Sequence, residues 1–225
     1  MTETDNISPI EGPASNTPAP AHNAPRRTAQ AVSWLLPPLV QPVYVLLTII
    51  FSDAYMIHLT GSVKLYLIWV ILLYSTVIPM LSIGFLRSIG ILSDLSISTR
   101  RSRIIPLLIG SICYVLCAIT LSKLVTVTAI HKFIIAAACC EIFALIVTPF
   151  WKISLHMIGM GCITAMFYLL NIAGMGQMFW ALVVSIICSG ALASARLQLQ
   201  SHNLAQIAAG FFGGFIIAMI AILFI

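Results

Sequence analysis

The sequence predicts an all-α protein, a polytopic bundle of about six or seven transmembrane helices. Hydrophobic residues make up 60% of the 225 residues and charged residues only 8%, and the mean hydropathy is +1.08. A water-soluble domain of this length needs more polar surface than these residues provide. The composition therefore excludes a soluble domain and indicates a chain integral to the bilayer, without a nucleic-acid partner.

The first 30 residues differ in composition from the rest of the chain. They are rich in Pro, Ala, Asn, Thr and Ser, hold three of the six acidic residues and lack the apolar run of a secretory signal. We expect a disordered tail over residues 1–30 and a transmembrane domain over residues 31–225.

Seven apolar segments follow, most of them close to the roughly 20 residues that a helix needs to cross a bilayer. The first contains Pro37, Pro38 and Pro42, so its helix is expected to begin late or to be kinked. The expected helices are residues 34–51, 63–85, 104–121, 129–148, 155–170, 178–193 and 204–225.

The apolar segments contain all six cysteines, without Cys-x-x-Cys spacing and without clustered histidines. We interpret them as small buried hydrophobic residues and predict no metal and no cofactor. Glu141 lies deep in the fourth segment, where it suggests either a relay role or a protonated carboxyl bonded to a neighbouring helix. Gly210 and Gly214 predict close helix packing, inside the bundle or between subunits.

An arginine, a histidine and a glutamine stand near the start of the last segment. If His202 opens this helix, Gln206 lies one turn further on the same face and can hold the imidazole, while Arg196 approaches from the preceding loop. Helix N-termini attract anions, so the group suits a phosphate attacked by a histidine nitrogen. The alternative is an interfacial histidine beside a snorkelling arginine.

Three arginines, Arg100, Arg101 and Arg103, stand immediately before the third segment. Guanidinium groups suit phosphate oxygens. They are equally typical of a positive-inside anchor or of a contact with anionic headgroups.

Lys152, Ser154 and His156 form a third polar group, at the start of the fifth segment. They offer a charge, a hydroxyl and a ring that titrates near neutral pH. A helix cap and an interfacial ring are the alternative interpretation.

The three polar groups are separated by two helices each, so all three are expected on the same membrane face. Together they would provide cations for a phosphate, two histidines and a polar group that orients one of them. This set is typical of phosphoryl transfer through a phosphohistidine.

From residue 100 to the end, the chain resembles the type 2 phosphatidic acid phosphatases, whose pattern is Lys-x6-Arg-Pro, then Pro-Ser-Gly-His, then Ser-Arg-x5-His-x3-Asp. The third motif matches best, as Arg196, five residues, His202, three residues and then Gln206, with Ala195 in place of the serine. Of the second motif, Ser154 and the histidine two residues later remain. In the first, Arg103 stands three residues before a proline and no lysine lies at the expected distance, as in an Arg-rich variant of a divergent bacterial branch.

The resemblance implies a bundle with this family's core and assigns roles by position. His202 would be the nucleophile and His156 the general acid, and the remaining residues would contact phosphate: Arg196, Ser154 and Arg103 by their motif positions, with Arg100, Arg101 and Lys152 beside them. Gln206 would replace the aspartate that stabilises the imidazolium, which weakens catalysis or leaves a site that binds phosphate without cleaving it.

The resemblance therefore implies a membrane-embedded phosphatase of a phosphatidate, a phosphatidylglycerol phosphate or a polyprenyl diphosphate. The alternative is a non-catalytic lipid-headgroup-binding or assembly protein with the same fold. A bacterial inner-membrane location is expected. The sequence leaves open the oligomeric state and the side of the membrane that carries the site.

Overall fold

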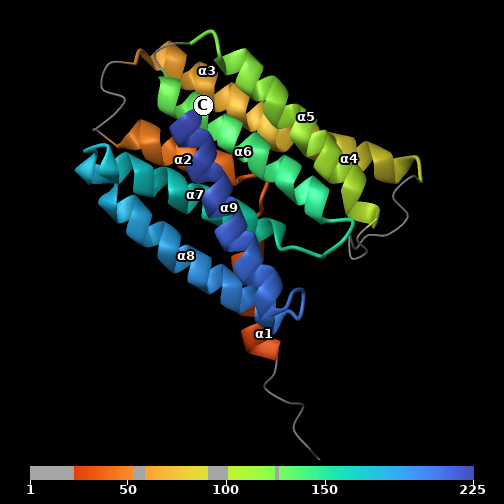
Figure 1. Ribbon diagram of the computed structural model, residues 1–225. Helices are drawn as coiled ribbons and strands as arrows, with labels where there is room; N and C mark the ends of the chain where they lie inside the picture. Colours follow the sequence, from red (N-terminus) through yellow and green to blue (C-terminus); the bar gives the residue numbers. More distant parts are fainter. Residues whose placement is uncertain (1–22, 53–58, 91–100, 125–126) are drawn as a thin grey trace, which may run out of the picture.

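The computed structural model describes residues 23–52, 59–90, 101–124 and 127–225, and the only regular elements in these ranges are helices. The predicted all-α class is therefore confirmed. Figure 1 shows the helices gathered in one bundle. Their bounds are α1 Asn23–Leu35, α2 Gln41–Phe51, α3 Gly61–Leu72, α4 Ile78–Ser88, α5 Ile104–Leu121, α6 Thr128–Val147, α7 Leu155–Ile172, α8 Phe179–Gln198 and α9 Leu204–Phe224.

Within the described residues, six helices are long and apolar enough to cross a membrane. These are α5 to α9 together with the continuous helix Gly61–Ser88, which joins α3 and α4 through a π-helical turn at Leu73–Val77. Pro79 is the second residue after this turn, and the wider turn accommodates the missing N–H of a proline. The chain is thus an integral membrane protein by the length and composition of its helices.

The first predicted helix, residues 34–51, begins late, as its prolines led us to expect. Pro37 and Pro38 interrupt it, so α1 ends at Leu35 and α2 begins only at Gln41. With 11 residues, α2 spans about 16 Å and cannot cross a bilayer alone. Residues 23–30, expected in the disordered tail, belong to α1, which packs against α8.

The most buried of the six spans is α7, and its closest partner is α9. Gly214 faces the carbonyl of Ile158, and Gly161 faces the backbone of Phe211, so closely that a Cβ at either glycine would collide with main-chain atoms. Gly210 similarly faces the carbonyl of Ser154. The small residues of α9 therefore pack inside the bundle, one of the two predicted possibilities.

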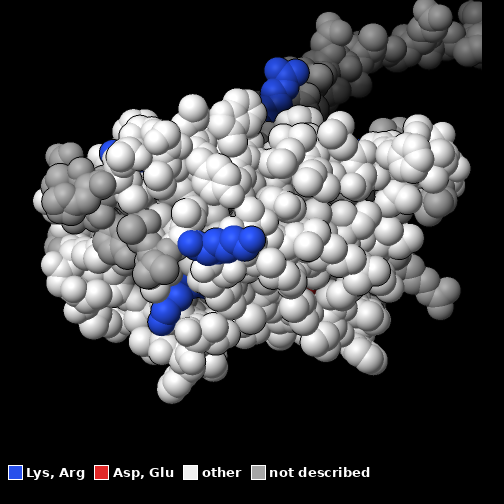
Figure 2. All heavy atoms as spheres, turned by 90° about the horizontal axis from the view of Figure 1, so that it is seen from above, with Lys and Arg blue, Asp and Glu red and all other residues white. Residues whose placement is uncertain are grey.

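The outer surface is apolar, as expected for helices in contact with lipid. Large side chains such as Trp69, Ile187 and Phe212 are 62%, 65% and 60% exposed. Figure 2 shows one face of the molecule almost free of charge, with a few isolated basic side chains. Charged and polar groups that are turned inward are therefore the exceptions that need an explanation.

We predict that Gly214→Ala lowers the melting temperature, because the new methyl group would meet the backbone of α7. Overpacking of this kind costs about 1–3 kcal/mol. Gly190→Ala is the matched control, because a Cβ there meets no atom within 4 Å. Thermal unfolding in detergent checks the pair, and equal melting temperatures would contradict the tight α7–α9 contact.

Candidate active site

A cavity of about 240 Å³ lies at the end of the bundle where α5, α7 and α9 begin and α8 ends. Four of the predicted site residues line it: Arg103, His156, Arg196 and His202. The structure thus brings together side chains that are up to 99 residues apart in the sequence. The apolar helices around them form the walls.

Arg103 and Arg196 supply the positive charge of the cavity. Arg103 precedes α5, and Arg196 lies in the last turn of α8 rather than in the loop that the sequence suggested. Burial and the nearby Arg196 charge lower the pKa of Arg103. The Nε atom of Arg196 is buried and has no hydrogen-bond partner among the described residues. Two like charges held close together attract an anion, which would relieve their repulsion.

Gln206 orients His202 and at the same time caps α9. Its Oε1 accepts the backbone N–H of Asn203 at 3.2 Å, while the Asn203 side chain accepts the Gln206 N–H at 2.9 Å. Because a backbone N–H donates to this atom of the Gln206 side chain, the atom is the amide oxygen and not the amide nitrogen. The same Oε1 lies 3.2 Å from Nδ1 of His202, so Nδ1 carries the proton and the neutral ring keeps the lone pair on Nε2.

His202 is neutral at physiological pH. Burial, together with the charges of Arg196 and Arg103, lowers its pKa to about 4, although the hydrogen bond that the ring donates to Gln206 opposes this shift. A neutral imidazole with a free nitrogen is the form that can attack an electrophile.

The second histidine, His156, lies in the first turn of α7. Its ring lies near the backbone of Ser33 on α1, and its carbonyl accepts the Gln41 Nε2–H at 3.4 Å. The sequence did not predict that α1 lies beside His156. Ala29 and Ser33 are two small residues one helical turn apart, and both are buried. This spacing is the sequence signal that could have predicted the contact of α1 with the site.

Ser154 is buried, two residues before His156, but it is not one of the cavity-lining residues among those described. It is 0% exposed, and its Oγ has no hydrogen-bond partner among the described residues. Its N–H donates to the Gln206 carbonyl at 3.4 Å, so it joins the starts of α7 and α9.

The remaining predicted phosphate contacts are placed differently. Lys152 is half-buried just before α7, and its pKa is lowered by burial and by the charges of Arg103 and Arg196. The repulsion from Arg103 and Arg196 indicates that Lys152 lies near the basic cavity. Arg100 lies outside the described residues, and the side chain of Arg101 is likewise not described.

Comparisons with known proteins give no help with identity: no family model, no curated protein and no solved structure matches the chain. In the part of the chain that is described, no group of three or more His, Cys, Asp or Glu side chains could hold a metal ion. The chemistry of the cavity must therefore be argued from its own residues.

We predict that the His202 ring titrates near pH 4 in the folded protein, well below the usual 6.5. Because burial and the arginines disfavour the imidazolium, the ring stays neutral as the pH falls from 7 to about 5. Ring ¹⁵N chemical shifts of histidine-labelled protein measure the midpoint, with His202→Ala to assign the signal. A midpoint at 6.5 or above would contradict the buried, cation-flanked position.

Proposed function

We propose that the chain is a lipid-phosphate phosphohydrolase that works through a phosphohistidine. The observation that carries this proposal is the oriented, neutral His202, whose Nδ1 is held by Gln206 in a cavity shared with Arg103, Arg196 and a second histidine. A histidine fixed by one nitrogen, beside two cations and a second proton carrier, is suited to attack phosphorus.

In the first step, Nε2 of His202 forms a bond to phosphorus and the P–O bond to the leaving group breaks, which is an ester bond in a phosphatidate and an anhydride bond in a polyprenyl diphosphate. The departing oxygen takes a proton that the neutral His156, which faces the same cavity, relays from the protonated phosphoryl group of the substrate, so that this ring ends the step neutral. Arg103 and Arg196 compensate the charge on the phosphoryl oxygens, which grows in the transition state.

In the second step, water attacks the phosphohistidine and the P–N bond breaks. The neutral His156 accepts a proton from the water and passes it to the phosphate that is released, so the ring returns to its neutral starting form. Nδ1 of His202 stays hydrogen-bonded to Gln206 throughout. Atoms and charges balance without any further reactant.

The surroundings of the cavity support a lipid substrate. The wall contains Leu39, Ile83 and Leu107 beside the basic groups, and the outer surface of the bundle is apolar. A phosphate that carries an acyl or prenyl chain can reach the cations while its chain remains in the bilayer. A phosphatidate, a phosphatidylglycerol phosphate and a polyprenyl diphosphate all have this character.

A second candidate function is the binding of lipid headgroups without cleavage. It is favoured by Gln206, because a neutral amide oxygen stabilises the imidazolium less than a carboxylate does. In the serine protease triad, replacing the aspartate by asparagine costs about 10⁴ in turnover. The same pocket would then serve as a phosphate receptor in an assembly protein.

We predict that purified protein releases phosphate from a lipid phosphate and that His202→Ala lowers turnover by about 10³-fold or more, since the nucleophile is lost. Phosphate release from a panel of lipid phosphates in detergent measures the effect. His131→Ala is the matched control, because His131 lies in the first turn of α6, at the opposite end of the bundle. Full turnover in His202→Ala would reject this nucleophile.

Gln206→Glu separates the two candidate functions. The new side chain keeps the reach of glutamine and its place in the capping box, and it adds the charge that stabilises the imidazolium. We expect kcat to rise by about tenfold, which corresponds to about 1.4 kcal/mol in the barrier. Gln206→Asp adds the same charge on a shorter arm and should gain less.

The kinetic constants for this pair are measured separately, since a carboxylate near the arginines also repels phosphate and raises KM. No turnover in the wild type and in both variants, with lipid phosphate still bound, would support the headgroup-binding function instead.

A further inference from the structure

A second, smaller cavity adjoins the basic one on its inner side. Its volume is about 40 Å³, and the two cavities share lining residues, among them Tyr114, Glu141 and Leu155. Glu141 stands six residues before the end of α6, which is about 9 Å along the helix. The inner cavity therefore lies within the span of the membrane, and its size suits a small ion or water rather than a lipid chain.

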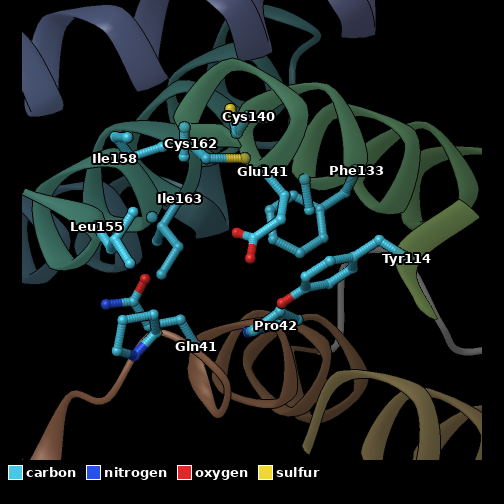
Figure 3. A pocket seen from close by; sticks show the side chains of 14 residues that line it. Gln41, Pro42, Tyr114, Phe133, Cys140, Glu141, Leu155, Ile158, Cys162 and Ile163 are labelled. Atoms are coloured by element: carbon cyan, nitrogen blue, oxygen red, sulfur yellow. The ribbon is translucent and has the colours of Figure 1, made fainter. Parts of the chain in front are cut away.

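Three oxygen-bearing side chains border this inner cavity. Figure 3 shows the carboxylate of Glu141 and the hydroxyl of Tyr114 directed into it from α6 and α5, with the amide of Gln41 facing them from α2. The Nε2 atom of Gln41 donates to the carbonyls of Leu36 and His156, at 3.2 and 3.4 Å. Gln41 is only 2% exposed, and its Oε1 has no hydrogen-bond partner among the described residues.

Two glycines make room for the amide and the carboxylate. A Cβ at Gly159 would collide with Oε1 of Gln41, and a Cβ at Gly110 would lie 2.6 Å from a carboxylate oxygen of Glu141. Both oxygen-bearing groups therefore lie against bare backbone, which fixes their positions at the edge of the cavity.

The break between α1 and α2 adds a main-chain oxygen to the same place. Pro42 has no N–H, so the carbonyl of Pro38 lacks the donor that residue 42 would supply in a continuous helix. Pro38 lines the inner cavity. Interrupted membrane helices with free carbonyls are the places where transporters coordinate sodium ions.

The charge of the inner cavity is unbalanced. Among the described residues that line it, Glu141 is the one acidic side chain and no lysine or arginine is present. An unpaired carboxylate in the membrane interior costs free energy, as does a buried amide oxygen without a donor. A bound cation would relieve both costs. A single positive charge balances one carboxylate, whereas a divalent ion would leave an excess charge in apolar surroundings.

We propose that the inner cavity binds one alkali cation, sodium or potassium, with the Glu141 carboxylate, the Gln41 Oε1 and the Tyr114 hydroxyl as ligands. Carboxylate, amide and hydroxyl oxygens are hard donors that suit such an ion. The ion would also cancel the carboxylate charge beside the basic cavity, which otherwise opposes an anion held by the arginines. This inference goes beyond the proposed function and does not depend on it, because the ion binds whether or not the basic cavity cleaves phosphate.

The test measures the melting temperature of the full-length protein in detergent, in chloride salts of sodium, potassium or N-methylglucamine at one ionic strength. Constant chloride removes any effect of an anion on the arginines. We expect sodium or potassium to raise the melting temperature by about 3–6 °C over N-methylglucamine at ten times its Kd, because the ion binds only the folded protein. Separate titrations show which of the two ions binds more tightly. No rise with either ion would overturn the proposal.

Two variants locate the ion in the inner cavity. Glu141→Gln removes the charge with little change of shape and should abolish the rise. Tyr114→Phe removes one ligand and should increase the half-saturating salt concentration by about tenfold. Tyr168→Phe is the matched control, because Tyr168 packs against Phe215 outside both cavities. The wild-type rise in Glu141→Gln would overturn the assignment. Melting in N-methylglucamine chloride shows whether each variant is folded.

Direct binding gives a second measurement that holds even if Glu141→Gln does not fold. Purified wild-type protein is incubated with radioactive sodium, or with radioactive rubidium as a tracer for potassium. We expect saturable binding of about one ion per protein for at least one tracer, weakened in Tyr114→Phe and unchanged in Tyr168→Phe. Absence of saturable binding for both tracers would overturn the proposal. Neither measurement uses hydrolysis, so failure of the ion site and failure of the proposed function are seen separately.

Discussion

The close approach of α7 and α9 is the constraint on which the site depends. At Gly161, Gly210 and Gly214 the two helices meet backbone to backbone, so their first turns also lie together. Only then can the Ser154 N–H reach the Gln206 carbonyl. Lipid gives no hydrophobic drive for helix association, and close contact between small residues supplies the packing energy instead. The position of His202 relative to His156 therefore follows from glycines that touch neither ring.

Several ionisable side chains of this bundle lie around one cavity. The outer surface is apolar, yet two arginines and two histidines face one cavity, and a carboxylate lies beneath them. Such an arrangement costs free energy in an empty protein, because like charges are close and partly desolvated. Stability alone gives no reason to keep it. An anionic group between the two arginines would offset the part of the cost that comes from their repulsion.

The sequence predicted the fold class and four residues of the cavity for a simple physical reason. A membrane helix must satisfy its own backbone, so the number of helices between two motifs determines the face on which they emerge. Arg103, His156, Arg196 and His202 follow from that rule. The contributions of Ser33 and Gln41 could not be predicted from that rule. Ser33 acts through its backbone, and Gln41 is positioned by the break in the helix at two prolines. Ser154, predicted as a phosphate contact, is not among the described residues that line the cavity, and its backbone N–H joins α7 to α9.

Gln206 links the structure of α9 to the chemistry of the site. Its Oε1 serves two donors, the His202 ring and the Asn203 backbone, so helix capping and histidine orientation depend on one atom. A carboxylate could serve both donors and would also favour the imidazolium, raising the pKa of His202 from its present value of about 4. The neutral amide fixes the same tautomer and leaves the ring uncharged between two arginines. It therefore favours the neutral, attacking form of the histidine over the charged form that follows. In a site already rich in cations, a glutamine at position 206 keeps the His202 ring neutral and available as a nucleophile. Stabilisation of the phosphorylated ring then depends on the bound phosphoryl group itself.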